Sequence, residues 1–427
     1  MAIAARQNKA RPARVLIYSH DTFGLGHLRR CRAIAHALVD CFDDMSVMIL
    51  SGSPIIGRYE FRNRVDFVRI PGVIKLRDGD YVSLSLPLAI EETVAIRSSI
   101  IEHTCAVFAP DLFIVDKEPL GLRGEVLPVL QQLEDTATQV VLGLRDVMDS
   151  PEQLAAEWQR KGVYPALEQL YDQIWVYGPS YLNNPLDGIT LPRAVHDKLR
   201  FTGYLRRDED SDAQPLAEVP FGGSPFLLVT PGGGGDGVEL VDWILRAYEA
   251  QARPLFPSLI VAGPFMPSAA LQEFGARADR LRDVALLRFT SHMEQYMRAA
   301  TAVVAMGGYN TFCELLSFDK PALLVPRVQP RREQAIRAEK AATRGLVQML
   351  AIDEYPRIEP MVNALAALPS LPPPSRFGAG QMLGGLTQVC RLARTLLPPI
   401  EARGSAAFTG KRRATEPEKG GQDADAN

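Results

Sequence analysis

Short apolar runs alternate with longer stretches of helical periodicity along most of this chain. Short apolar runs are typical of strands buried in a parallel sheet, and apolar residues at helical spacing are typical of helices that cover one. The first half predicts strands over residues 14–19, 46–50, 67–70, 112–115, 139–144 and 173–177, and helices from 27 onward, over 87–108 and over 121–134. This alternation predicts a doubly wound α/β domain over residues 14–207.

The second half repeats this arrangement. It predicts strands over residues 225–230, 259–261, 285–289, 301–305 and 323–325, and helices over 238–250, 293–300 and 335–344. A fall in apolar content over 208–223 indicates a linker, so we expect a second domain of the same type over 224–367. Ligands of such sheets lie beyond the carboxyl ends of the strands. We therefore expect a ligand between two facing domains.

The remaining segments carry simpler patterns. Residues 1–13 and 403–427 are expected to be disordered, the latter because it is polar and charged. A proline-rich stretch over 368–376 predicts a second linker. Amphipathic spacing over 381–397, within the segment 377–402, predicts a C-terminal helix.

Composition excludes several classes of protein. The 427 residues carry a formal net charge of −3 and are 47% hydrophobic, which indicates a soluble globular protein with no electrostatic reason to bind nucleic acid. The five cysteines are scattered and form no C-x-x-C pair, so we expect a reducing compartment and neither a disulfide framework nor a zinc site. Because no apolar signal segment or membrane-spanning run is present, we expect a cytoplasmic protein.

Two D-x-D sequences, at residues 78–80 and 208–210, are typical of some metal and nucleotide sites. Both lie in turn-rich polar stretches without a preceding buried strand, so we interpret them as solvated turns. We predict no metal site.

Glycine-rich turns precede two of the predicted helices in the second half. Residues 232–235 are four glycines between a strand and a helix, and Gly307 and Gly308 stand in the same position further on. The free N–H groups and the dipole of a helix N-terminus suit a phosphate. Glu314, one turn into its helix, suits the vicinal hydroxyls of a ribose. The alternative is that Thr311 and Glu314 form a capping box.

Candidate catalytic residues follow strands of the first half. His27 lies where a turn-rich loop meets a helix, and its imidazole suits a general base, although a local hydrogen bond at the helix end is the alternative. Acidic and basic residues that directly follow two strands are candidates for the acceptor side of a cleft, or else solvated loop charges. They are Asp116, Glu118, Arg145 and Asp146.

The second half offers further polar candidates. Gln334 near a helix start can both donate to and accept from sugar hydroxyls, and Arg331 and Arg332 either neutralise phosphate or form a solvated face. The turn before His292 offers backbone groups to a nucleotide base, whereas His292 itself either caps its helix or is solvated.

Two segments resemble a known family. Residues 24–30, Gly-Leu-Gly-His-Leu-Arg-Arg, resemble the G-x-G-H-x-x-R loop of GT-B nucleotide-sugar enzymes. Residues 307–314, with Lys320, Pro321 and the segment 326–334, resemble the C-terminal signature of glycosyltransferase family 28. That family contains the transferase that adds N-acetylglucosamine to the lipid-linked peptidoglycan precursor, and the chain is most similar to an uncharacterised branch of predicted glycosyltransferases. The resemblance spans residues 14–345 and is sparse in the first half.

The resemblance implies a GT-B fold, in which two Rossmann-like domains face a cleft and the C-terminal helix crosses back onto the first. It implies that the first domain binds the acceptor and the second binds the donor, with the pyrophosphate at 232–235, the ribose at Glu314 and the sugar at Gln334. The residues implied in catalysis are His27, Asp116 and Glu118, and those of the cleft loop are Gly24, Gly26 and Arg29. The residues implied in donor binding are Gly232, Gly233, Gly234, Gly235, His292, Gly307, Gly308, Asn310, Thr311, Glu314, Arg331 and Gln334.

The sequence departs from the family in two places. Arg337 stands where the family has Asn, and residues 116–119, Asp-Lys-Glu-Pro, replace the Gly-rich acceptor loop, so the acceptor stays open. It is a saccharide, a lipid-linked molecule or a small molecule, and a lipid-linked acceptor would bring the protein to the inner face of a membrane.

We expect the enzyme to move a hexose-type sugar, an N-acetylhexosamine, from a UDP-sugar to an acceptor hydroxyl with inversion, without metal or other cofactor. The nucleotide-sugar is a substrate. The alternatives are a nucleotide-sugar hydrolase that uses water as the acceptor and a nucleotide-sugar binding protein without turnover.

Overall fold

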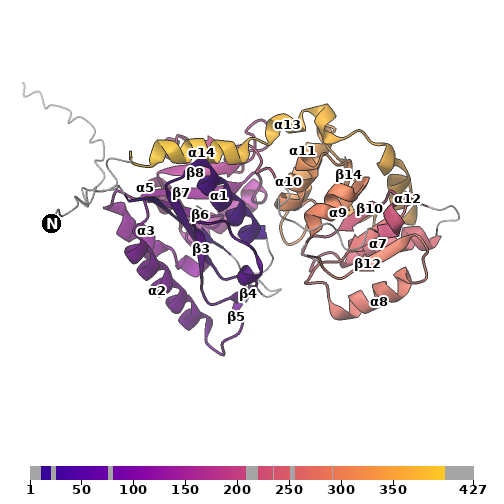
Figure 1. Ribbon diagram of the computed structural model, residues 1–427, viewed down its shortest axis with the longest axis horizontal. Helices are drawn as coiled ribbons and strands as arrows, with labels where there is room; N and C mark the ends of the chain where they lie inside the picture. Colours follow the sequence, from indigo (N-terminus) through magenta and orange to yellow (C-terminus); the bar gives the residue numbers. More distant parts are fainter. Residues whose placement is uncertain are drawn as a thin grey trace, which may run out of the picture.

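The computed structural model describes residues 11–399 except 21–25, 76–79, 208–219, 234, 251–254 and 291. Two α/β domains lie side by side, each built on a parallel sheet with helices on its faces (Figure 1). The expected pair of doubly wound domains is therefore confirmed. Some sequence-based expectations fall outside the described residues, namely those on 1–10, 400–427, Gly24, Asp78, 208–219 and Gly234.

The first domain contains a seven-stranded parallel sheet in the order β3-β2-β1-β6-β7-β8-β9. Its strands are β1 (Ala13–Ser19), β2 (Met45–Ser51), β3 (Val65–Arg69), β6 (Leu112–Asp116), β7 (Gln139–Arg145), β8 (Gln173–Tyr177) and β9 (Leu199–Phe201). Its helices are α1 (Gly26–Cys41), α2 (Ile90–Phe108), α3 (Leu127–Glu134), α4 (Pro151–Lys161), α5 (Val163–Gln169) and α6 (Arg193–His196). The apolar pattern does not predict a separate antiparallel pair, β4 (Val73–Lys75) and β5 (Tyr81–Ser83).

The second domain contains a six-stranded parallel sheet in the order β12-β11-β10-β13-β14-β15. Its strands are β10 (Leu227–Thr230), β11 (Ser258–Val261), β12 (Val284–Leu287), β13 (Ala302–Ala305), β14 (Ala322–Leu324) and β15 (Gln348–Met349). The helices of this half are α7 (Val238–Ala250), α8 (Ser268–Ala278), α9 (Met293–Ala299), α10 (Tyr309–Ser317), α11 (Glu333–Thr343), α12 (Ile358–Ala367), α13 (Ala379–Met382) and α14 (Gly385–Leu396).

The strand order of each sheet changes direction at its first strand. In the first sheet β1 lies between β2 and β6, and in the second β10 lies between β11 and β13. In open α/β sheets, ligands bind at this switch point, beyond the carboxyl ends of the two strands. His27 follows β1, Asp116 is the last residue of β6, and Gly232 and Gly307 follow β10 and β13. The topology therefore places these candidate residues at the two switch points.

One predicted helix is shorter than its pattern suggested. The helix expected over 121–134 begins only at Leu127. Gly121, Arg123 and Gly124 have φ values of 70°, 48° and 87°, which a right-handed helix does not allow. The apolar spacing continues through this turn and so conceals it.

The C-terminal segment crosses back onto the first domain as two helices, whereas one was expected over 381–397. The break lies where the backbone pairs with the first domain: the N–H of Tyr204 donates to the carbonyl of Met382 at 2.6 Å, and the N–H of Gly385 donates to the carbonyl of Tyr204 at 3.0 Å. These bonds engage backbone groups that a continuous helix would use itself. Beyond the break, α14 packs along α1 (Figure 1).

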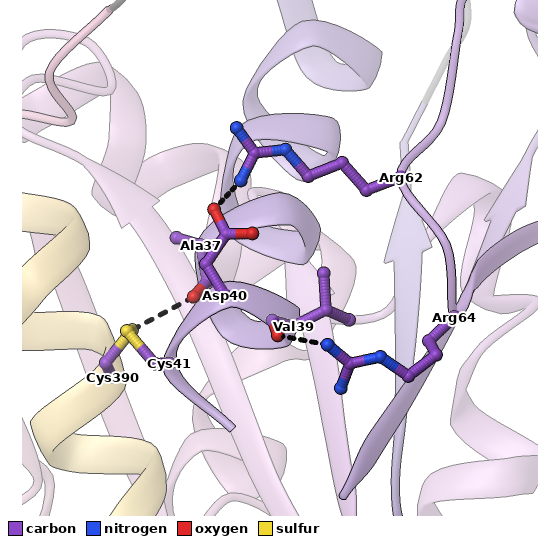
Figure 2. Close-up of a disulfide and its surroundings, with 7 residues drawn as sticks. All are labelled: Ala37, Val39, Asp40, Cys41, Arg62, Arg64 and Cys390. Atoms are coloured by element: carbon purple, nitrogen blue, oxygen red, sulfur yellow. Dashed lines mark hydrogen bonds and ion pairs between the residues drawn. A yellow bond between two sulfur atoms is a disulfide. The ribbon is translucent and has the colours of Figure 1, made fainter. Parts of the chain in front are cut away.

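A disulfide joins these two helices and corrects an expectation. Cys41 at the end of α1 is bonded to Cys390 of α14 across a sequence separation of 349 (Figure 2). On the other side of α1, Arg64 donates to the carbonyl of Val39 at 2.7 Å. The prediction of no disulfide was wrong because the two cysteines become neighbours, with Cα atoms 6.4 Å apart, only when the chain crosses back.

The two domains also share apolar contacts. Tyr204 follows the last strand of the first domain, and its ring lies 5.3 Å from that of Phe312 in α10. Both side chains are fully buried in one core cluster. In the part of the chain that the structure describes, no helix combines the length and apolar character needed to cross a membrane.

Candidate active site

His27 and Asp116 form a close pair at the switch point of the first sheet. His27 lies in the first turn of α1, Asp116 is the last residue of β6, and Nδ1 of His27 lies 2.6 Å from Oδ2 of Asp116. Arg30, one turn further along α1, donates from Nε to Oδ1 at 2.8 Å and from Nη2 to Oδ2 at 2.6 Å. Residues three apart share one side of a helix, so α1 presents both side chains to the same carboxylate.

Burial and the neighbouring charges determine the protonation states of His27 and Asp116. Burial alone would raise the pKa of Asp116, but Arg30 and His27 hold it well below its usual value. Burial lowers the pKa of His27 to about 4, against the opposing effect of Asp116. Near neutral pH, therefore, Asp116 is ionised and His27 is uncharged. An ionised carboxylate only accepts, so Nδ1 of His27 carries the proton and Nε2 carries the lone pair that a general base requires.

A second histidine and a buried polar chain lie next to His27. The ring centroids of His20 and His27 lie 5.7 Å apart, and Nδ1 of His20 lies 3.3 Å from the hydroxyl oxygen of Tyr18. The Tyr18 hydroxyl donates to Glu125 at 2.5 Å, and Arg97 of α2 donates to the same carboxylate at 2.5 Å and 2.6 Å. Sequence reasoning did not identify this group. The available signal was Arg97, a charged residue at a buried position of an apolar helix.

Glu118, a predicted catalytic residue, is held in ion pairs. Its two carboxylate oxygens lie 2.9 Å from Nζ of Lys117 and 3.0 Å from Nζ of Lys161. Burial would raise the pKa of Glu118, but Lys117 and other nearby cations hold it well below its usual value. Glu118 is thus ionised near neutral pH, and its cations reduce its basicity.

Glu314 lies at the boundary between the two domains. It is 2% exposed and accepts a hydrogen bond from Arg29 of α1, whose guanidinium also lies 2.5 Å from Glu294 of α9. Burial raises the pKa of Glu314, against the effect of Arg29. The capping-box alternative is wrong, because α10 begins at Tyr309 and Thr311 lies inside the helix.

Two other predicted donor residues also make contacts across the boundary. Asn310 donates from Nδ2 to the carbonyl of Gly26 at 2.9 Å. Arg331 donates from Nη2 to Glu157 of α4 at 2.8 Å. Gln334 stays within its own domain, where its Oε1 accepts from the N–H of Arg327 at 3.2 Å.

Arg337, the residue that departs from the family pattern, forms a fully buried bridge. Its guanidinium donates to Oδ1 of Asp146 at 2.6 Å and to Oδ2 at 2.9 Å, and both side chains are 0% exposed. It also donates to the carbonyl of Gly307 at 3.0 Å. Asp146 directly follows β7, so this bridge joins the carboxyl end of the first sheet to α11 of the second domain.

The glycine turns precede two helices of the second domain. Gly232 has a φ of 78°, Gly233 and Gly235 are exposed, and α7 begins at Val238. Gly307 has a φ of 81°, and Gly308 is the N-cap of α10, where no side chain caps the helix. The N-terminal N–H groups of α10 thus lack a side-chain cap. His292 is exposed at the start of α9 and likewise makes no capping bond.

The structure therefore connects His27, Asp116, Gly26 and Arg29 of the first domain with Asn310 and Glu314 of the second, through the contacts given above. Among the described residues, no three His, Cys, Asp or Glu side chains are grouped so that they would hold a metal ion.

Comparison with known proteins links this arrangement to an enzyme class. Residues 259–369 match the family described as "Glycosyltransferase family 28 C-terminal domain". An uncharacterized glycosyltransferase of Methanosarcina acetivorans is 24% identical over 352 residues, which cover 78% of this chain and 85% of that protein. The UDP-N-acetylglucosamine-N-acetylmuramyl-(pentapeptide) pyrophosphoryl-undecaprenol N-acetylglucosamine transferase of Alkaliphilus metalliredigens is 23% identical over 134 residues, which cover 31% of this chain and 37% of that protein.

A solved structure shares the fold over nearly the whole chain. LpCGTa in complex with UDP superimposes with a TM-score of 0.59 at 14% identity, covering 91% of this chain and 100% of that one. Together with the matches in sequence, this likeness identifies the chain as a glycosyltransferase of the GT-B fold that is similar to family 28.

Proposed function

We propose that this glycosyltransferase moves a hexose-type sugar, an N-acetylhexosamine, from a UDP-sugar to an acceptor hydroxyl, with inversion and without a metal ion. The observation that carries the proposal is the contact of 2.6 Å between Nδ1 of His27 and Oδ2 of Asp116 at one switch point. The helix that carries His27 also contacts the donor-side helix α10. That arrangement supplies a base on one side of the reacting centre and an anion-binding helix terminus on the other.

The base acts on the acceptor. Nε2 of His27 takes the proton of the acceptor hydroxyl as its oxygen bonds to the anomeric carbon of the donor sugar. The bond from that carbon to the diphosphate oxygen breaks, and its electron pair leaves with the diphosphate. One displacement inverts the anomeric centre. Asp116 stabilises the imidazolium that forms, because it lies 2.6 Å from Nδ1.

The second domain receives the leaving group. The N-terminus of α10 has no side-chain cap, and its N–H groups and dipole favour the negative charge that develops on the diphosphate. The exposed glycines before α7 allow a phosphate to approach the backbone closely. These groups stabilise the charge without a cation, which is the basis for proposing metal independence.

The nucleotide and the sugar are proposed from relatives and from one carboxylate. The named relative from Alkaliphilus metalliredigens uses UDP-N-acetylglucosamine, and the LpCGTa structure holds UDP. The match to the former is confined to 31% of the chain. We assign Glu314 to the ribose hydroxyls. Arg29 bonds to Oε1, and an ionised carboxylate can accept further hydrogen bonds at Oε2.

Substitution of His27 tests the base. His27→Ala should lower the turnover of UDP-N-acetylglucosamine with a panel of sugar acceptors about 10²–10⁴-fold, the usual contribution of a general base. UDP affinity, measured by calorimetry, should be unchanged because His27 belongs to the acceptor side. His103→Ala, at an exposed position of α2, is the matched control. Full turnover in His27→Ala would refute the assignment.

Two further measurements complete the test. Glu314→Ala should weaken UDP binding, and unchanged affinity would refute the ribose assignment. Release of free sugar without an acceptor, at the rate seen with the best acceptor and lost in His27→Ala, would instead identify water as the acceptor.

A further inference from the structure

Arg145 is a basic residue at the boundary between the domains, and its guanidinium makes no hydrogen bond within the described residues, whereas Arg207 and Arg327 donate to Asn310 and Glu333. It is the last residue of β7, so its backbone lies at the carboxyl end of the first sheet, where Asp146 follows. Its Nε is buried and has no hydrogen-bond partner. Within the described ranges, the guanidinium of Arg145 forms no ion pair, and the side chain is only partly exposed.

The neighbouring arginines all have carboxylate partners. Arg30 is paired with Asp116 at 2.6 Å, Arg337 with Asp146 at 2.6 Å, and Arg331 with Glu157 at 2.8 Å. Burial first, and then these three guanidiniums, lower the pKa of Arg145 to about 10, with Glu333 opposing them. Arg145 is thus a charged group among three cations whose own carboxylates are already bound, and Glu333 is the carboxylate that partly offsets them. A partly buried cation without a partner is unfavourable unless a ligand supplies one.

Two other side chains affect the charge at this position. Lys117, paired with Glu118, has its pKa lowered to about 8 by burial, with Arg331 and Arg145 contributing. Glu333 at the start of α11 accepts from Arg327 through Oε1, whereas its Oε2 is buried without a partner. Both an unpaired guanidinium and an unpaired carboxylate oxygen are therefore present, one on each domain. A sugar that carries an anionic group has the matching chemistry, because its hydroxyls donate and its anion accepts.

We propose that Arg145 binds a carboxylate or phosphate group on a substrate of this enzyme, and that Oε2 of Glu333 accepts a hydroxyl of the same molecule. Guanidinium groups bind both kinds of anion through paired hydrogen bonds. The inference rests on the proposed function and assigns the anionic group to one of two molecules: the acceptor, or the transferred sugar, which would then be an anionic hexose in place of a neutral N-acetylhexosamine.

Calorimetry with matched probes tests this proposal. Glucose 6-phosphate, glucuronate and glucose, each added to the UDP-saturated enzyme, probe the acceptor; UDP-glucuronate and UDP-glucose probe the donor. In one of the two sets, the wild type should bind an anionic member at least tenfold more tightly than the neutral one. Arg145→Gln should remove that preference, and Arg145→Lys should retain part of it. The set that shows the effect identifies the molecule that carries the anion. Arg193→Gln, at an exposed position of α6, is the control.

Failure of the anionic-substrate proposal can be distinguished from failure of the proposed transferase function. UDP binding and the dependence of turnover on His27 test that function, and Arg145→Gln should leave UDP affinity unchanged. Equal affinity for anionic and neutral members in both sets, or a preference that survives in Arg145→Gln, would overturn the proposal. Thermal unfolding of the unliganded Arg145→Met variant gives an independent check. Its midpoint should equal or exceed that of the wild type, and a lower midpoint would show that Arg145 serves the fold instead.

Discussion

Replacing Arg337 by Met should destabilise the protein more than other surface or boundary changes to a single arginine. The substitution keeps an unbranched side chain of similar length and removes the guanidinium. Asp146 then loses the donors at 2.6 Å, 2.9 Å and 3.1 Å and keeps only the Tyr204 hydroxyl at 2.8 Å. Because the carboxylate is 0% exposed, water cannot replace the lost donors.

The expected loss is large. Removing one partner of a buried, hydrogen-bonded ion pair costs about 3–5 kcal/mol, because the other charge is left buried and uncompensated. Adding Asp146→Asn to the Arg337→Met variant removes the buried negative charge and retains an oxygen that accepts from the Tyr204 hydroxyl. The double variant should therefore be more stable than Arg337→Met alone, with a coupling of about 0.5–3 kcal/mol between the two positions.

Urea unfolding followed by tryptophan fluorescence measures both effects. Trp175 lies in β8 of the first domain and Trp243 in α7 of the second, so the signal reports on each domain. The control is Arg332→Met, an exposed change at the start of the same helix, which should alter stability by less than about 0.5 kcal/mol. If Arg337→Met behaved like this control, the bridge would contribute little and the reasoning would be refuted.

Two further predictions concern the other contacts between distant segments. Arg29→Ala removes one of the two cations that lower the pKa of Glu314, so this pKa rises further and the carboxylate is protonated at higher pH. The acid limb of UDP binding in calorimetry should therefore move to higher pH, and a limb that stays in place would contradict the assigned role of Glu314. Cys390→Ser opens a covalent loop that spans a separation of 349 residues. The free energy of unfolding, measured by urea titration without reductant, should therefore fall by about 2–5 kcal/mol. An unchanged value would show that the Cys41–Cys390 bond contributes nothing to stability.

Much of the fold was predictable because its signals are local. The buried strands of a parallel sheet appear as short apolar runs, so β1, β6, β7 and β10 are visible in the chain. The glycines at 232, 307 and 308 are likewise a local signal, and they indicate turns between strands and helices. Errors occurred where periodicity continues through an irregular backbone, as at 121–126, and where a distant segment interrupts a helix, as at Leu383 and Gly384.

The candidate site was only partly predictable. His27 and Asp116 each stood out, as a histidine at a helix start and a carboxylate after a strand, but their hydrogen bond spans 89 positions. Nothing local indicates that Arg29 reaches Glu314, since 285 positions separate them. The same holds for the buried group of Tyr18, Glu125 and Arg97.

The alternation of strands and helices, the two domains and the candidate groups at each switch point could be predicted from the chain, because these follow from spacing within a few residues. The pairing of charges could not, because it depends on the tertiary structure. The pairing of Arg337 with Asp146, the unpaired state of Arg145 and the bond between Cys41 and Cys390 depend on how the two sheets face each other. The strength of such contacts depends on separations of a few ångströms and on exclusion of water, and the packed chain sets both.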